Sequence, residues 1–186
     1  MKKILVVFVL LFMMSCNRKL QDASEQYFDG IKSEVTDKFG VNSYFAGLTV
    51  TESAQGTVIS VLHCSNPQNL ETNCYVYAKG VWKEMYKQPL KALPNIKPEN
   101  FLFKLDEKID SYTLSKIVKS AQKDIRDRIH VNDLKLYQLA VRPPKSGNVS
   151  SMHYQVTIKS DSLQRDFYYR YNIDGTLYDA ELNNTE

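Results

Sequence analysis

The chain has 186 residues, of which 43% are hydrophobic, 24% charged and 11% aromatic. This composition is typical of a globular protein with one domain or two small ones, and it excludes collagen, a coiled-coil rod, a disordered low-complexity chain and a disulfide-dense miniprotein. The formal net charge of +3 falls to +1 if the first 15 residues, which include Lys2 and Lys3, are removed. A body this close to neutral gives no support to nucleic-acid binding.

The first 15 residues have the pattern of an export signal. Lys2 and Lys3 precede an apolar run from residue 4 to residue 14. At ~1.5 Å per residue, a helix of this run is about half as long as the ~30 Å hydrocarbon core of a bilayer. The run ends at the small residue Ser15, directly before Cys16, which favours a signal over a stable membrane span. A plain secretory signal and an uncleaved anchor are the alternatives.

The end of this segment resembles the lipobox of bacterial lipoproteins, with the sequence Met13-Met14-Ser15-Cys16. In that family the cysteine thiol receives diacylglycerol, the signal is cut before the cysteine, and the new amino group is acylated. The resemblance implies a signal peptide at 1–15 and a lipidated tether at 16–20, with diacylglycerol and an N-acyl chain on Cys16 as the only bound groups. Met13 stands where leucine is commonest, and such loose lipoboxes are similar to those of the Bacteroidota.

The residues after Cys16 bear on where such a lipoprotein is placed. Asn17 favours the outer membrane over retention at the inner membrane. Arg18 and Lys19 lack the acidic character of known surface-export signals. The resemblance therefore implies a lipoprotein of the outer membrane that faces the periplasm.

Cys64 and Cys74 remain as a pair if Cys16 carries lipid, and the compartment is oxidising. Residues 57–64 and 74–82 are predicted to be neighbouring strands, which places these cysteines at the feet of a hairpin, where facing Cβ atoms meet disulfide geometry. The sequence thus predicts a Cys64–Cys74 disulfide, with free thiols or a metal or catalytic site as alternatives. No metal is expected, because the three histidines are scattered singly along the chain, at His63, His130 and His153.

Residues 21–86 are predicted to form a first αβββ unit. Asp22 and Glu25 have the spacing of a capping box that opens a helix, and Gly40 is a natural stop. One face of this helix is apolar, with Tyr27, Ile31 and Val35 at four-residue spacing. Strands are expected at 44–51, 57–64 and 74–82.

Residues 87–100 contain three of the six prolines in the chain. Proline fixes φ and removes a hydrogen-bond donor, so this segment is predicted to be an extended connector. It is either a linker between domains or a crossover that straps over a single fold.

Residues 101–182 are predicted to form a second αβββ unit, followed by a tail at 183–186. A short strand at 101–105 precedes a helix that Asp110 or Ser111 caps, and one face of this helix is apolar: Leu114, Ile117, Val118, Ala121, Ile125 and Ile129. Its other side carries Lys116, Lys119, Lys123, Arg126 and Arg128, which predict a solvated face, with contact to anionic lipid or a partner as the alternative. Strands are expected at 134–142, 152–159 and 167–171, and Asp174-Gly175 is a hairpin-type turn.

The two halves share one order of elements, which predicts an α+β fold with one helix on each small antiparallel sheet. The units either join into one longer sheet or stay separate, and the likeness is either a duplication or a coincidence. The second unit ends in Asn172-Ile173-Asp174-Gly175-Thr176-Leu177, which resembles PepSY-like domains, and tandem versions are similar to the beta-lactamase inhibitory protein. Members of such families are binders, inhibitors or regulators more often than enzymes.

The chain contains none of the usual nucleotide-binding, hydrolase or metalloprotease motifs. Tyr169 and Tyr171 share one face of a predicted strand and pack in a core or at an interface. If they face the helix, Tyr168 and Arg170 point outward and are candidate partner contacts. We therefore expect a lipid-anchored, non-catalytic binding or inhibitor-like protein with an envelope protein as partner. An envelope hydrolase built on scattered carboxylates and a purely structural envelope protein are the alternatives.

Overall fold

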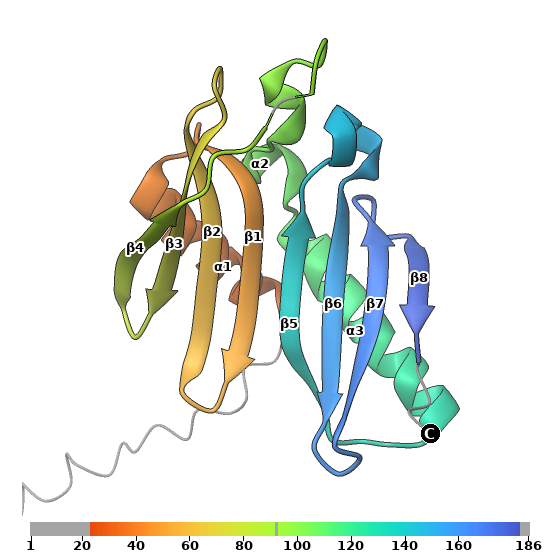
Figure 1. Ribbon diagram of the computed structural model, residues 1–186. Helices are drawn as coiled ribbons and strands as arrows, with labels where there is room; N and C mark the ends of the chain where they lie inside the picture. Colours follow the sequence, from red (N-terminus) through yellow and green to blue (C-terminus); the bar gives the residue numbers. More distant parts are fainter. Residues whose placement is uncertain (1–22, 92, 183–186) are drawn as a thin grey trace, which may run out of the picture.

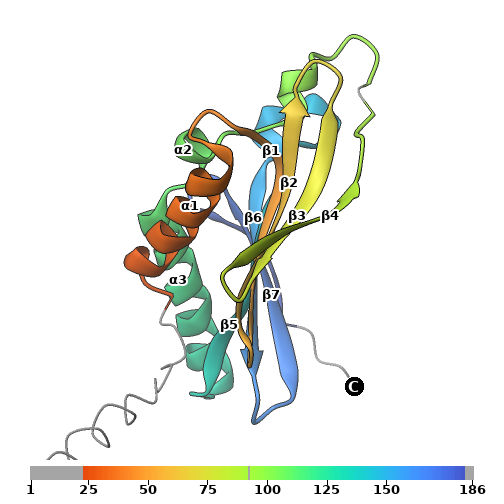
Figure 2. The same ribbon diagram turned by 90° about the vertical axis from the view of Figure 1, so that its left-hand side faces the viewer.

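The computed structural model describes residues 23–91 and 93–182. Eight antiparallel strands form one sheet in the order β4-β3-β2-β1-β5-β6-β7-β8. The two long helices, α1 and α3, lie on the same face of this sheet (Figure 2). The fold is therefore α+β, as predicted. The opposite face of the sheet, here called the open face, is turned toward the viewer in Figure 1.

Helix α1 (Glu25–Phe39) begins and ends at residues suited to those positions. Ser24 is the N-cap, and its hydroxyl oxygen accepts a hydrogen bond from the Tyr27 backbone N–H at 3.2 Å. Gly40 ends the helix with φ of +89°, a conformation that favours glycine. The predicted cap, Asp22, lies outside the described residues, and the prediction is wrong because Ser24 performs the capping.

Four strands follow α1, and not the three that the sequence predicts: β1 (Tyr44–Ser53), β2 (Gly56–Asn66), β3 (Glu71–Ala78) and β4 (Val81–Lys87). The predicted strand at 74–82 is divided by a two-residue turn. Lys79 and Gly80 both have positive φ, at 53° and 80°, as a type I′ hairpin turn requires. Lysine is an uncommon first residue of such a turn, so the sequence pattern concealed it.

The second half also has four strands after its long helix. Asp110 caps α3 (Ser111–Ile129), and its carboxylate accepts a hydrogen bond from the Thr113 backbone N–H at 2.9 Å. The strands are β5 (Leu134–Arg142), β6 (His153–Ser160), β7 (Arg165–Asn172) and β8 (Leu177–Glu181). The predicted turn at Asp174-Gly175 is present, and it leads into β8. The expected αβββ units are therefore not what the structure contains.

The two halves join where β1 pairs with β5 along four residues, from Leu48 opposite Val141 to Thr51 opposite Gln138. The main core lies between the sheet and the helices. Helix α3 contributes Ile117, Val118, Ala121 and Ile125, each at most 1% exposed. Because their spacing is helical, one face of α3 is apolar along its length and packs on the sheet.

The Pro-rich connector crosses the open face near one end of β1, β2 and β3 (Figures 1 and 2). This segment, residues 88–91 and 93–104, is here called the strap; it contains η1 (Pro98–Phe101) and leads into the short helix α2 (Leu105–Lys108). The Gln88 and Leu90 backbone N–H groups donate to Thr72 and Leu70 carbonyls at 2.8 and 3.1 Å. The strap closes a second, smaller core made of Ala46, Cys64, Leu70 and Leu102.

Candidate functional site

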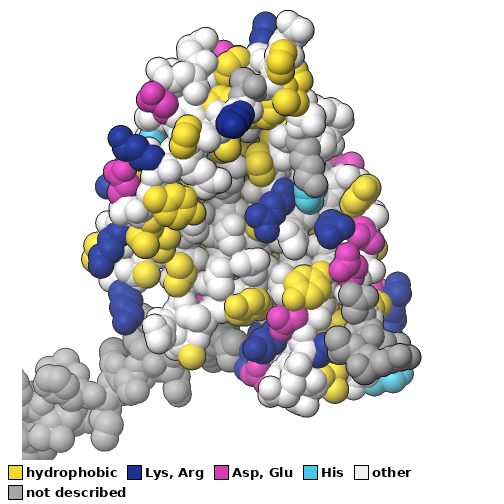
Figure 3. Space-filling model, viewed as in Figure 1, with side chains coloured by type: hydrophobic (Ala, Val, Ile, Leu, Met, Phe, Trp, Pro, Cys, Tyr) yellow, Lys and Arg dark blue, Asp and Glu magenta, His cyan; other side chains and the backbone are white. Residues whose placement is uncertain are grey.

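The centre of the open face is a field of small polar side chains. Strand alternation turns these residues away from the helices, and strand pairing sets them side by side: Thr49, Thr51, Ser60, Gln138 and Gln155. Figure 3 shows this region as a mostly uncoloured band along the middle strands. A polar surface of this kind is hydrated in isolation and suits hydrogen bonds with a partner.

The two flanks of the open face differ in chemistry. Hydrophobic side chains gather over β3 and β4 (Figure 3), where Val81 and Tyr86 are each 55% exposed. Charged side chains of both signs lie over β7 and β8 in the same view. The second flank also carries the exposed Tyr168. Tyrosine and arginine are enriched where proteins meet, because each combines contact area with hydrogen bonding.

The structure places Tyr168 and Arg170 together on the open face of β7. Phe167, Tyr169 and Tyr171 point the other way and are at most 2% exposed beneath α3. The guanidinium of Arg170 donates to Asp179 at 3.0 Å and to Glu181 at 3.4 Å. All three side chains are about two-fifths exposed, so each ion pair contributes little stability. These contacts hold the guanidinium in a fixed orientation on the surface.

A shallow depression of about 630 Å³ lies between strands β7 and β8 and the β5–β6 loop at residues 143–152. Arg142, Arg170 and His153 contribute its basic side chains. The Arg142 Nε donates to Gln155 Oε1 at 3.0 Å. Two guanidinium groups beside a ring nitrogen and hydroxyls suit the carboxylates and carbonyl oxygens of a partner.

Sequence reasoning missed Arg142 as part of this site. A bulge between Leu136 and Gln138 shifts the alternation of β5, so Leu139 and Val141 face the helix while Arg142 faces outward. Without the bulge, Arg142 would lie on the same face of β5 as Leu136. A bulge leaves no reliable mark in a single sequence, whereas the outward position of His153 follows from the alternation of β6.

His153 and Ser151 line the depression together, but their contact is not that of a base and a nucleophile. The His153 Nδ1 lies 3.0 Å from the Ser151 carbonyl oxygen. The Ser151 hydroxyl donates to the Asn148 carbonyl at 2.7 Å. Nucleophilic catalysis requires the base to face the hydroxyl proton, whereas this contact orients the imidazole against the backbone of the β5–β6 loop.

The predicted Cys64–Cys74 disulfide is wrong for this structure, in which both thiols are free and buried. The strands run past the cysteines, so the hairpin tip lies at residues 67–70. Cys64 pairs with Thr72, and Cys74 pairs with Leu62, which makes the cysteines diagonal neighbours. Cα atoms of diagonal neighbours are about 7–8 Å apart, beyond the reach of a disulfide. Burial raises the pKa of the Cys64 thiol, which makes it less reactive.

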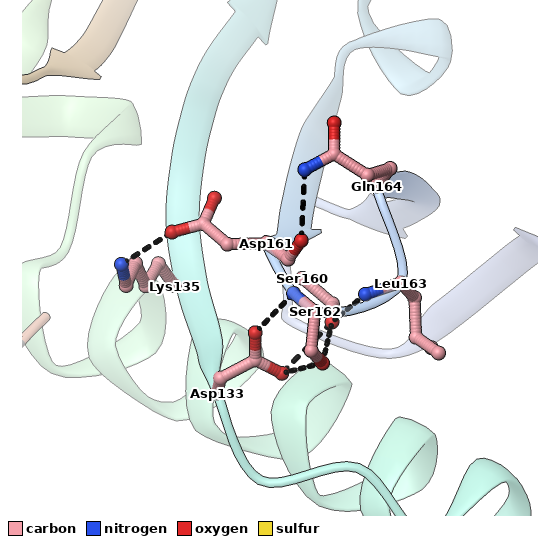
Figure 4. Close-up of polar contacts among 7 residues, drawn as sticks. All are labelled: Asp133, Lys135, Ser160, Asp161, Ser162, Leu163 and Gln164. Atoms are coloured by element: carbon pink, nitrogen blue, oxygen red, sulfur yellow. Dashed lines mark hydrogen bonds and ion pairs between the residues drawn. The ribbon is translucent and has the colours of Figure 1, made fainter.

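A second polar cluster organises the β6–β7 turn (Figure 4). The Asp133 carboxylate accepts hydrogen bonds from the Ser162 backbone N–H at 2.6 Å and from the Ser160 and Ser162 hydroxyls, both at 2.8 Å. These donors lower the pKa of Asp133 from 3.8 to about 2, the Ser162 N–H being the largest cause. Lys135 and Asp161 form an ion pair beside it at 2.6 Å. The donors to Asp133 all lie in or directly beside the β6–β7 turn, so this carboxylate fixes the turn.

Comparisons with known proteins bear on the fold only. No family model and no curated protein matches the chain. One solved structure is similar. It is a protein from Clostridium difficile 630 described as a "putative lipoprotein (CD1622)", and the match covers 83% of this chain and 91% of that chain with a TM-score of 0.52. At 13% sequence identity, the similarity shows that the two chains share a fold.

Cys16 lies outside the described residues, so the structure gives no geometry for the predicted lipid site. In the part of the chain that is described, the longest helices are too short or too polar to span a bilayer. The same residues bring no three histidine, cysteine, aspartate or glutamate side chains together as a set of metal ligands.

Proposed function

We propose that this protein is a lipid-anchored protein of the cell envelope that binds a partner protein through the open face of its sheet. The observation that carries this proposal is the division of the sheet into two faces. Both long helices pack on one face, and the other presents a polar centre flanked by Tyr168, Arg170 and Arg142. A wide polar surface that also carries exposed tyrosine and arginine is typical of a protein-binding interface.

Two lines of support favour the lipid anchor. The first is the short signal-like segment that ends in Ser15-Cys16. The second is the name of the structurally similar protein from Clostridium difficile 630, which is described as a "putative lipoprotein". We place diacylglycerol and an N-acyl chain on Cys16 and the body on the periplasmic side of the outer membrane. Several acyl chains make such an attachment persistent.

We propose further that the protein binds without catalysing a reaction. The chemistry of the depression supports this, since His153 faces a serine carbonyl while two carboxylates of β8, Asp179 and Glu181, are engaged by Arg170. Guanidinium groups held in this way bind carboxylates and carbonyl oxygens. An inhibitor-like role fits the same geometry, because a broad sheet face covers a partner's surface and does not enclose a small substrate.

A relation between the two halves is also part of the proposal. We interpret α1 with β1–β4 and α3 with β5–β8 as two related αββββ units. The strand order is symmetric about the β1–β5 junction, and such symmetry is expected if two copies of one unit pair through the same edge strand. This interpretation extends each expected αβββ unit by one strand.

The binding proposal is tested by recovering partners of the lipidated full chain from envelope extracts. Arg142→Ala combined with Tyr168→Ala should lower recovery of a specific partner at least about tenfold, since truncation of a central interface residue costs ~2 kcal/mol or more. The matched control is Lys119→Ala combined with Tyr112→Ala, which removes one cationic side chain and one tyrosine from the helical face. Equal recovery with both variants, at equal unfolding midpoints, contradicts the proposal.

The anchor is tested by Cys16→Ala. This change should abolish incorporation of labelled palmitate and leave a precursor that still carries residues 1–15. A Cys16→Ala chain that incorporates palmitate and is processed like the wild type contradicts the proposed lipid site.

A further inference from the structure

One surface feature on the helical side has no part in the proposed binding face. Helix α3 carries a row of exposed side chains at steps of four and three residues, here called the basic row: Tyr112, Lys116, Lys119, Lys123, Arg126 and His130. Residues at these spacings lie along one line on the surface of a helix. The row thus runs the whole length of α3, with an exposed tyrosine at its start.

The basic row lies diametrically opposite the apolar face of α3. At 100° per residue, the centre of the row is separated by about 140–180° from Leu114, Ala121 and Ile125, which are buried against the sheet. The row therefore points straight out from the helical side of the molecule. Tyr112, with 60% of its surface exposed, projects in the same direction.

The cations of the row are not neutralised within the described part of the chain. No ion pair is found there for Lys116, Lys119 or Lys123, and Arg126 donates to the Gln122 carbonyl. The acidic residues of α3 are Asp124, which pairs with Arg128 at 2.8 Å, and Asp127 at the rim of the row. Helix α1 lies on the same side of the sheet and carries the exposed acidic residues Glu25 and Asp29. The positive charge of the helical side is therefore concentrated on α3 and not on α1.

The start of α1 ties this side of the molecule to the proposed anchor. In both ribbon views the chain enters α1 beside α3, on the helical side (Figures 1 and 2). Seven residue steps separate Cys16 from Ala23, the first described residue, and seven residues span at most ~25 Å. A lipid on Cys16 therefore keeps the start of α1, on the helical side, within ~25 Å of the bilayer surface.

We infer that the basic row of α3 is the membrane-facing surface of this protein and that it contacts the headgroups of anionic phospholipids. The inference rests on the proposed lipid anchor. Lysine and arginine are attracted to anionic headgroups, and tyrosine is favoured at the interface between headgroups and water. The apolar face of α3 stays in the protein core, so the contact is electrostatic and involves no insertion of the helix. It turns the open face toward the aqueous compartment, where a partner protein is accessible.

The experiment is lysine footprinting of the lipidated full chain in two kinds of vesicle. One kind is phosphatidylcholine alone, and the other contains about one-third phosphatidylglycerol. Each cation close to an anionic surface strengthens attachment about fivefold. We expect acylation of Lys116, Lys119 and Lys123 to slow at least about fivefold in the anionic vesicles, while Lys83 and Lys91 react equally in both. Salt at about 1 M, where the Debye length is ~3 Å, should remove the difference.

A pair of charge-reversal variants keeps the test specific. Lys119→Glu with Arg126→Glu should abolish the protection of Lys116 and Lys123, and Lys83→Glu with Lys87→Glu should leave it intact. Equal labelling of both lysine groups in vesicle-bound protein overturns the membrane contact and leaves the anchor standing. A chain that is not recovered with vesicles of either kind overturns the anchor, and the membrane contact with it.

Discussion

The two halves of the sheet bury their aromatic side chains to different depths. Beneath α3, Tyr154, Tyr169 and Tyr171 are each at most 2% exposed. Beneath α1, Tyr75, Tyr77 and Trp82 occupy the helical face but are only partly buried. Helix α3 has 19 residues and α1 has 15, so the shorter helix leaves the edge of its half less covered.

Each half compensates in its own way. In the first half, Phe39 stacks on His63 with ring centroids 4.7 Å apart and meets Tyr75 and Trp82 edge to face. The strap then adds a small core on the open face. In the second half, α3 covers the tyrosines of β6 and β7, and burial together with a hydrogen bond to Asp124 raises the pKa of Tyr169. The second half therefore needs no cover on its open face, and that surface stays available.

The largest effect should come from emptying the deeper core. Tyr169→Ala removes a ring that is 1% exposed and should cost about 3–5 kcal/mol of the free energy of unfolding. Tyr75→Ala is the matched change in the first half, and it should cost clearly less because water reaches that ring. Urea unfolding measures both variants. Equal losses in the free energy of unfolding would contradict the difference in burial between the two halves.

A smaller effect is expected where the strap meets the β5–β6 loop. Gly147 has φ of +68°, and a Cβ there would lie 2.2 Å from Ile96 Cγ2. Gly147→Ala should therefore destabilise the protein by about 1–3 kcal/mol. Gly30 lies inside α1 with nothing near its Cβ position, so Gly30→Ala should stabilise by about 0.5–1 kcal/mol. Thermal unfolding measures the sign of the stability change for each variant. Two changes of the same sign would show that the strap contact is not rigid.

The smallest effect is a pH dependence confined to the second half. Asp133 organises the β6–β7 turn, whereas the amides of Asn66 and Asn69 organise the β2–β3 turn. Because the folded pKa of Asp133 is lowered to about 2, its contribution is complete above about pH 4 and is lost as the pH falls through about 2. Asp133→Asn should reduce the pH dependence of the unfolding midpoint between these values. The control, Asp29→Asn in α1, should keep the wild-type slope, and a slope unchanged by Asp133→Asn would contradict the assignment.

Sequence patterns predicted the parts of this fold that depend on neighbours along the chain. The apolar spacing of α3, the Asp110 cap, the Gly40 stop and the alternation that turns Tyr168 and Arg170 outward are all confirmed. Each depends on residues within one or two turns of helix, or within one strand, where period and capping chemistry act directly.

The features that sequence reasoning missed depend on register and on contacts between distant segments. The Lys79-Gly80 turn hid β4, and the bulge in β5 hid the outward position of Arg142. The register of β2 against β3 places Cys64 and Cys74 diagonally and not directly opposite each other, although the two strands are adjacent. A shift of the strand register by one or two residues does not change local strand propensity, so a single sequence does not determine the register.

The central claim is that the open face, and not the helical face, meets the partner protein. The most direct test inserts a photo-crosslinking amino acid at Tyr168 or at Tyr112 in the lipidated full chain within intact cells. Both tyrosines are exposed, and they lie on opposite sides of the sheet. We predict a discrete protein adduct from position 168 and none from position 112. A protein adduct from position 112 alone would contradict the claim.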